Sequence, residues 1–260
     1  MKHAIVTGAS KGLGKALAQA MAARGYDVLL VARSEALLEQ LASEITQQHP
    51  VKAHCLALDL ALPVSADQIA AWCADRGFQP SVLINNAGFA CWGYFEKLSL
   101  ALQLQMLNLH VQGMVALTHQ LLPALRKHEQ AYVLNVSSTT AYQAVPTLSL
   151  YAASKTFVRS FSRGLRYELR NSPVSVTCLS PGPMSTNFIA EANMHAMQQT
   201  AAKFEMTADE VARRGVKAMF NRRAEVIPGW MNRLTVVLSK VVPDALLERI
   251  ASNLYQSKLS

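Results

Sequence analysis

The sequence has no long hydrophobic run, few cysteines and no low-complexity stretch. No apolar run reaches the ~18 residues that a membrane-spanning helix needs. The chain passes from Met1 almost directly into an apolar segment, without a leader or cleavage site, so we expect a cytoplasmic protein. The cysteines lack CxxC or Cys/His spacing, which predicts reduced structural thiols and no metal site. They are Cys55, Cys73, Cys91 and Cys178.

Charged residues are also scarce, at 16% of the chain, whereas hydrophobic residues make up 51%. This balance argues against disorder, and 260 residues are enough for one large domain with its own core. The formal net charge of +8 raises the question of an anionic partner. Lys and Arg are not gathered in one block, and no aromatic-basic pattern accompanies them. We therefore expect a diffuse surface excess and no nucleic-acid partner.

Short β-like runs alternate with helix-length stretches along the chain. Strands separated by helices predict right-handed crossovers and a parallel α/β sheet covered on both faces, within a single domain at 1–260. The expected strands are Ala4–Thr7, Val28–Val31, Ala53–Ala57, Val82–Ile84, Tyr132–Val136, Val174–Cys178 and Ala224–Ile227. The expected helices include Ser34–Gln48, Leu100–Lys127, Ser149–Arg170, one from about Thr207, Gly229–Lys240 and Asp244–Ser257.

A glycine-rich turn follows the first expected strand and opens a helix. Glycine permits positive φ and close backbone approach, and a helix N-terminus attracts a pyrophosphate. This context predicts a dinucleotide cradle, although the spacing is Gly-xxx-Gly-x-Gly and not GxGxxG. Its residues are Gly8, Ser10, Lys11, Gly12, Leu13 and Gly14.

The end of the second strand indicates which dinucleotide binds. An NAD site generally places a carboxylate there for the adenosine ribose. This chain has Ala32, Arg33 and Ser34 instead. Arg33, with Lys11 from the first loop, is suited to pair with a 2′-phosphate, so the sequence favours NADPH over NADH.

Tyr151 and Lys155 stand four residues apart on one face of an expected helix. A nearby ammonium favours the phenolate, so we expect Lys155 to lower the pKa of Tyr151 and fit it for acid/base work. Ser138 ends a strand at the edge where a parallel sheet binds its ligand. It is a candidate to polarise a substrate carbonyl, with turn capping as its structural alternative.

Five separated motifs occur in the order typical of the short-chain dehydrogenase/reductase family: TGASKGLG, NNAG, SS, YAASK and PGPMST. The resemblance covers about residues 3–186. It implies a Rossmann-like, doubly wound sheet of about seven strands, a nicotinamide cofactor and a dimer or tetramer. It also implies a catalytic tetrad of Asn108, Ser138, Tyr151 and Lys155, with Asn108 supporting a relay water. Cofactor contacts are implied for Asp59, Leu60, Asn85, Ala87, Gly88, Tyr151, Lys155, Pro181, Gly182, Met184 and Thr186.

These observations lead to an NADPH-dependent oxidoreductase acting on a fairly apolar ketone, aldehyde or alcohol. Residues 1–186 would form the cofactor and catalytic core, and 187–260 the substrate-side and C-terminal helical region. Apolar residues after the catalytic helix are candidate pocket residues or plain helix core: Met184, Phe188, Ile189, Met194 and Met197.

Three alternatives stay open. The enzyme alternative is a 3-ketoacyl thioester reductase whose acidic partner meets Arg126, Lys127, Arg163, Arg166 and Arg170. A non-catalytic NADP(H)-binding protein is the alternative outside enzymes. The basic, apolar C-terminal helices either cap the domain or make weak contact with a membrane surface.

Overall fold

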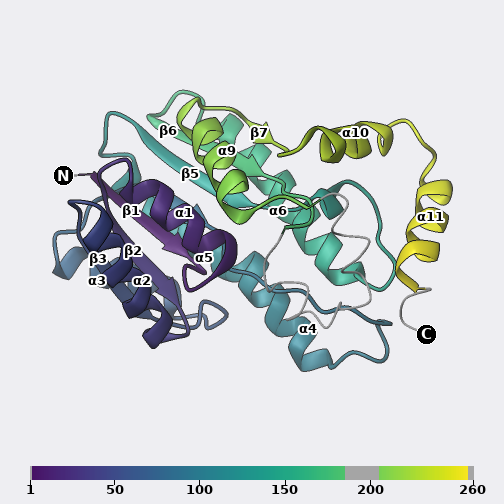
Figure 1. Ribbon diagram of the computed structural model, residues 1–260, viewed down its shortest axis with the longest axis horizontal. Helices are drawn as coiled ribbons and strands as arrows, with labels where there is room; N and C mark the ends of the chain where they lie inside the picture. The colour runs from purple at the N-terminus through teal and green to yellow at the C-terminus, as the bar shows by residue number, and fades with distance from the viewer. Residues whose placement is uncertain (1, 185–204, 257–260) are drawn as a thin grey trace.

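The computed structural model of the protein describes residues 2–184 and 205–256 (Figure 1). Seven parallel strands form one sheet in the order β3-β2-β1-β4-β5-β6-β7, which confirms the expected fold class. The strands are β1 Lys2–Thr7, β2 Tyr26–Ala32, β3 Ala53–Ala57, β4 Pro80–Asn85, β5 Ala131–Val136, β6 Val174–Leu179 and β7 Glu225–Val226.

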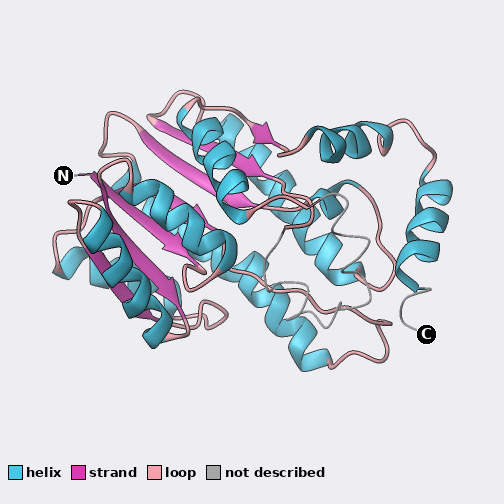
Figure 2. Cartoon of the chain, viewed as in Figure 1, coloured by secondary structure: helices cyan, strands magenta, loops and turns pink. Residues whose placement is uncertain are grey.

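Helices cover both faces of this sheet (Figure 2). One buried apolar cluster joins the sheet to α1, α2 and α9, and a second joins it to α3, α5 and α6. The α-helices are α1 Gly12–Ala22, α2 Glu35–Gln48, α3 Ser65–Asp75, α4 Leu100–Leu107, α5 Met114–Leu125, α6 Ser149–Glu168, α9 Ala208–Phe220, α10 Trp230–Leu238 and α11 Asp244–Gln256. A single-turn 3₁₀ helix, η2, spans Thr139–Tyr142.

The alternation of side chains along each strand explains the two layers. In β1, Ala4 and Val6 belong to the first cluster, whereas Ile5 between them belongs to the second. Successive strand residues point to opposite faces, so a strand that is apolar throughout must be covered on both sides. The near-continuous apolar runs of the sequence therefore specify a central parallel sheet.

The long helix expected over Leu100–Lys127 is not continuous, which corrects that prediction. A π-helical segment, η1 (Asn108–Gly113), separates α4 from α5. Gly113 ends this segment against the carbonyl oxygen of Leu60, where a Cβ atom would lie only 2.3 Å away. π segments inside helices frequently occur at functional sites because they turn side chains to new directions.

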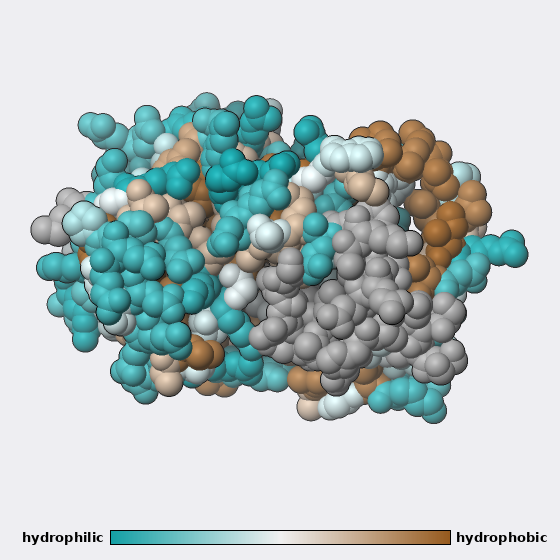
Figure 3. All heavy atoms as spheres, viewed as in Figure 1, coloured by the Kyte–Doolittle hydropathy of each residue, from teal (hydrophilic) through white to brown (hydrophobic). Residues whose placement is uncertain are grey.

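The C-terminal helices α10 and α11 lie beside the end of the sheet that carries β7 and α6 (Figure 1). Asn232 of α10 packs against Gly182, where a Cβ atom would lie 2.4 Å from the Asn232 amide oxygen. Ala251 of α11 is also buried. The outer faces of both helices expose apolar side chains (Figure 3). Among the described residues, no helix has the length and apolar character needed to cross a membrane.

Candidate active site

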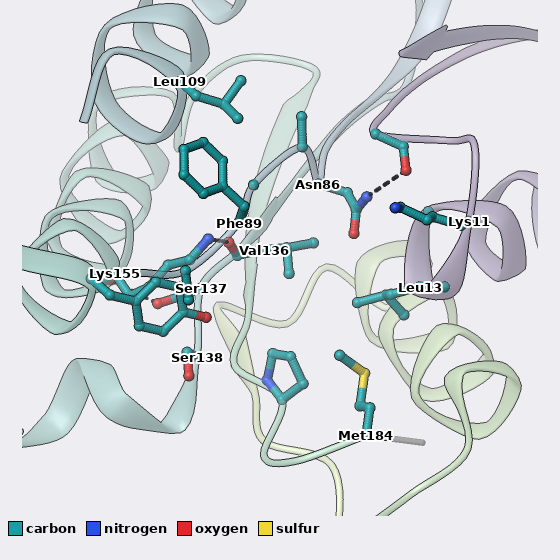
Figure 4. Close-up of a pocket in the computed structure, with 18 of the residues that line it drawn as sticks. Lys11, Leu13, Asn86, Phe89, Leu109, Val136, Ser137, Ser138, Lys155 and Met184 are labelled. Atoms are coloured by element: carbon teal, nitrogen blue, oxygen red, sulfur yellow. Dashed lines mark hydrogen bonds between the residues drawn. The ribbon is translucent and has the colours of Figure 1, made fainter. Parts of the chain in front are cut away.

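A cavity of about 800 Å³ opens at the carboxyl ends of the strands (Figure 4). It is lined by every described residue predicted for the site except Asn85 and Asn108. Figure 4 shows Lys11 and Leu13 on one side, with Ser138 and Lys155 on the other. The cavity therefore joins the expected phosphate end to the expected catalytic end. This position is where open α/β sheets bind their ligands.

The glycine-rich loop is held against the end of β4 by a side chain. Asn86 Nδ2 donates hydrogen bonds to the carbonyl oxygens of Thr7, at 2.9 Å, and Gly8, at 3.3 Å. Gly8 has a φ of +64°, and a Cβ atom on Gly14 would lie 1.9 Å from the Gly8 carbonyl oxygen. Glycine is required where the backbone packs this closely. The loop thus leads into α1 with the N-terminus of the helix at the cavity.

The residues after β2 meet the cavity as expected. Arg33 and Ser34 line it and are exposed, and Lys11 lines it from the first loop. Asp59 is the one carboxylate among the described lining residues, and its Oδ1 accepts a hydrogen bond from the Ala61 amide at 3.0 Å. Two cations and a helix N-terminus at this end of the cavity could hold the phosphates of a nicotinamide dinucleotide.

Tyr151 lies on α6 within an apolar cluster that includes Trp92 and Leu148, and only 8% of it is exposed. Burial raises the pKa of its phenol to about 12, partly offset by a hydrogen bond with Ser138, while Tyr255 raises it further. This corrects the expected lowering by Lys155, because desolvation of the phenolate outweighs other effects. At neutral pH Tyr151 therefore carries its proton.

Lys155 is one turn further along α6 and is also buried. Its Nζ donates a hydrogen bond to the Val136 carbonyl oxygen at 3.2 Å, and burial lowers its pKa to about 8. The Ser137 hydroxyl donates to the backbone carbonyl oxygen of Lys155 at 2.7 Å. Two hydrogen bonds therefore join the end of β5 to Lys155 on α6.

Ser138 caps a turn at the edge of the cavity. Its Oγ accepts a hydrogen bond from the Thr140 amide at 3.1 Å and so caps the η2 turn. The same residue lines the cavity and hydrogen bonds with Tyr151. Capping fixes the hydroxyl beside the phenol, so both groups can meet one substrate oxygen.

Comparison with known proteins decides the family. The family model described as short chain dehydrogenase matches residues 2–197. The chain is a short-chain dehydrogenase/reductase. It is 34% identical over 189 residues to a very-long-chain 3-oxoacyl-CoA reductase of Anas platyrhynchos, and the match covers 70% of this chain and 60% of that relative. The chain thus spans less than two thirds of the length of that relative.

Solved members of the short-chain dehydrogenase/reductase family share the fold. A 7β-hydroxysteroid dehydrogenase superposes with a TM-score of 0.87 at 23% identity, covering 96% of both chains. An alcohol dehydrogenase from Thermococcus sibiricus, complexed with 5-hydroxy-NADP, gives 0.77 at 26% identity over 87% of this chain and 95% of the other. A protein from Burkholderia phymatum in complex with NAD gives 0.83 at 21% identity, covering 91% and 92%.

Two of the described residues that were predicted for the site of this dehydrogenase/reductase, Asn85 and Asn108, are not on the cavity wall. The Asn85 amide is buried instead between β5 and α5, where its Nδ2 donates to Asn135 Oδ1 at 2.8 Å and Thr118 Oγ1 at 3.0 Å. Asn86, its neighbour, lines the cavity. Asn108 is half-buried at the start of η1, so its role with a relay water stays a prediction. Thr186 lies outside the described residues, as do Phe188, Ile189, Met194 and Met197.

His110 and the C-terminal wall of the cavity were not predicted from the sequence. His110 is buried, with its ring centre 5.8 Å from that of Tyr151. The signal for it was weak, because an unbroken α-helix would turn His110 away from any face that Asn108 occupies. Leu254 and Tyr255 of α11 line the cavity about a hundred residues after Tyr151. Only tertiary packing brings them there.

Proposed function

We propose that this protein is an NADP(H)-dependent oxidoreductase that interconverts a fairly apolar ketone or aldehyde and its alcohol. The observation that carries the proposal is the grouping of Ser138, Tyr151 and Lys155 at one end of a cavity whose other end is built for a dinucleotide. A non-catalytic NADP(H)-binding protein would need none of these three side chains in register.

The proposed chemistry follows from the state of each side chain. When bound, NADPH supplies the hydride that adds to the carbonyl carbon. Tyr151, protonated at neutral pH, donates its proton to the carbonyl oxygen, and the Ser138 hydroxyl hydrogen bonds to that oxygen. The Lys155 ammonium stabilises the negative charge of the phenolate that forms. It is also suited to hydrogen bond with the nicotinamide ribose. Reduction requires the phenol in its protonated form, and oxidation requires the phenolate.

Preference for NADP(H) is supported by Arg33 and Lys11 at the ribose end of the cavity. Each can form a charge-assisted hydrogen bond with a 2′-phosphate, whereas the residues at the end of β2, Ala32 to Ser34, offer no carboxylate for a free 2′-hydroxyl. The solved relatives carry either form of the cofactor, so this chain's own residues carry the proposal.

An apolar substrate is supported by the wall around Tyr151. Phe89, Leu148 and Tyr255 line the cavity and belong to the same apolar cluster as Tyr151. A fatty or polycyclic ketone would bury its carbon skeleton against such a wall while its oxygen meets Ser138 and Tyr151.

A 3-oxoacyl thioester is the second candidate substrate, favoured by the identity to the Anas platyrhynchos reductase. Two of the arginines suggested for an acidic partner are engaged within the protein, which weakens that part of the argument. Arg166 donates to the Val176 carbonyl oxygen at 2.9 Å, and Arg163 pairs with Glu225 at 3.4 Å. Recognition of a thioester would then depend on the apolar wall more than on these two arginines.

A panel assay tests the proposal. Aldehydes, simple ketones, steroid ketones and 3-oxoacyl thioesters are each offered with NADPH and with NADH. We expect NADPH oxidation with one apolar class and a slower rate with NADH. If no member of the panel is reduced although NADPH binds, the non-catalytic alternative replaces this proposal.

A further inference from the structure

His110 lies between two parts of the site that are far apart in the sequence. Its Nε2 is 3.1 Å from the amide nitrogen of Phe89, in the loop after β4, and its Nδ1 is 2.9 Å from Ser154 Oγ on α6. The Ser154 hydroxyl in turn lies 2.7 Å from the Tyr151 carbonyl oxygen. The imidazole therefore links the loop that lines the cavity to the helix that carries the acid/base residue.

The direction of these hydrogen bonds follows from their ends. A backbone amide only donates, so His110 Nε2 accepts and carries no proton. Nδ1 then holds the single proton of a neutral imidazole and donates it to Ser154 Oγ. The Ser154 hydroxyl donates to the Tyr151 carbonyl oxygen, which only accepts. All three hydrogen bonds are thus donated in the same direction, and together they link the Phe89 amide to the Tyr151 carbonyl oxygen.

The surroundings of His110 favour this neutral form. His110 is 2% exposed, and burial together with the charge of Lys155 holds its pKa well below the usual range. A Cβ atom on Gly88 would lie 2.5 Å from His110 Nε2 and 3.4 Å from Lys155 Nζ. A second cation in this space would oppose the ammonium of Lys155.

We propose that His110 is a positioning residue that holds the Gly88–Phe89 loop at a set distance from Tyr151 and Lys155 on α6. The loop and α6 line the same cavity, so their separation sets how the bound cofactor meets the acid/base group. This inference rests on the proposed function, because positioning matters only if Tyr151 does acid/base chemistry. Asn108, two residues earlier, is the first residue of the same π segment, and its own role stays a prediction.

The first test breaks this series of hydrogen bonds at His110, at Ser154 and, in a double variant, at both residues. In His110→Phe, we expect kcat per NADPH-binding site to fall by about tenfold to a hundredfold, with little change in the KM for the carbonyl. The isotope effect with C4-deuterated NADPH should rise, because hydride transfer becomes slower. Ser154→Ala breaks the same chain, so the double variant should lose no more than the larger single loss. Losses that multiply would overturn the inference.

Amide side chains that keep only one of the two His110 hydrogen bonds distinguish a positioning role from a packing role. An asparagine amide reaches roughly as far as Nδ1 and a glutamine amide roughly as far as Nε2, so each keeps one bond. Both His110→Asn and His110→Gln should lower kcat per binding site, and either one at the wild-type rate overturns the inference. They also carry the test if His110→Phe does not fold. His119→Phe, the same change at an exposed site on α5, is the matched control and should leave kcat unchanged.

Failure of this inference is distinguishable from failure of the proposed function. If Tyr151→Phe still turns over, the proposed function is wrong. If Tyr151→Phe is inactive while folded His110→Phe has the wild-type kcat and isotope effect, only the role of His110 is wrong.

Discussion

The ammonium nitrogen of Lys155 lies 5.7 Å from the centre of the Tyr151 ring, and both side chains are buried. Burial acts on the two groups in the same sense, because it disfavours the charged form of each. It raises the pKa of Tyr151 to about 12 and lowers that of Lys155 to about 8. Below pH 8 Tyr151 is thus neutral and Lys155 is charged, so proton transfer from Tyr151 leaves a phenolate beside a cation.

This arrangement predicts that Lys155→Met stabilises the fold while it removes activity. Below pH 8 the native protein buries a protonated lysine, at a cost of about 3 kcal/mol for a pKa lowered from 10.5 to about 8. The lost hydrogen bond to Val136 offsets about 1 kcal/mol of this. We expect a net gain of about 2 kcal/mol in the free energy of unfolding at neutral pH.

The sign of the pH dependence provides the check. Between pH 8 and 10.5 the unfolded chain binds the Lys155 proton and the native state does not, so wild-type stability rises with pH in this window. The advantage of Lys155→Met over the wild type should therefore shrink between about pH 7 and about pH 9.5. Urea unfolding at the two values measures it. A constant difference would mean that Lys155 does not titrate there.

The sheet and most of the cavity were predictable because local patterns report them directly. Apolar strands such as β1 must be covered on both faces, and glycines such as Gly14 stand where only a hydrogen atom fits. Both requirements constrain the residue type within a short segment, so they can be recognised in the sequence. The direction of the Tyr151 pKa shift was not predictable, because it depends on burial among residues from four separate segments.

The parts that were missed depend on long-range packing. His110 faces the site because η1 interrupts a helix that periodicity alone continues. Asn85 was expected at the cofactor, yet its side-chain amide donates hydrogen bonds to Asn135 and Thr118 inside the protein. Tyr255 reaches the cavity only through the fold of the C-terminal helices. The division of the chain at residue 186 stays a prediction, since 185–204 lie outside the described residues.

Arg33→Asp should reverse the cofactor preference. The wild type is expected to bind NADPH more tightly than NADH, because Arg33 and Lys11 can pair with the 2′-phosphate. Each charge-assisted contact contributes roughly 1.5–3 kcal/mol, which is about tenfold to a hundredfold in Kd. An aspartate would repel the phosphate and accept hydrogen bonds from the NADH ribose. Fluorescence titration gives both dissociation constants, and equal values in the wild type would contradict the prediction.

A dimer or tetramer is expected to form through α4–α5 and α6. The outer face of α6 exposes Phe157, which stacks on Phe161 at 5.9 Å, and the space outside Gly164 is open. An apolar, small-residue face suits an isologous helix pair. Sedimentation at micromolar concentration should show a multiple of 28.4 kDa. Phe157→Glu should shift the species toward monomer, while Glu168→Gln, an exposed change on the same helix, should not.

Weak contact with a membrane surface is expected at the C-terminal helices. Trp230, Val237, Val241 and Ile250 are more than half exposed, with side-chain exposure reaching 75% at Val241. Exposed cations accompany them at Arg233, Lys240 and Arg249. Flotation with anionic vesicles should show binding that salt weakens and that Val241→Glu reduces. Without any flotation, the membrane contact is wrong and the capping alternative for α10 and α11 remains.

Tyr151→Phe is the prediction on which the proposed function depends. It removes only the phenolic oxygen, so packing in the apolar cluster and NADPH binding should survive while the proton donor is lost. General acid catalysis contributes about 10²–10⁴-fold, and we expect a loss of kcat at or above this range. Ser138→Ala should lower kcat with little change in cofactor affinity, since its hydroxyl acts on the substrate oxygen. Circular dichroism and NADPH titration first establish that each variant is folded and binds cofactor. Near wild-type reduction by such a Tyr151→Phe protein would show that another group supplies the proton.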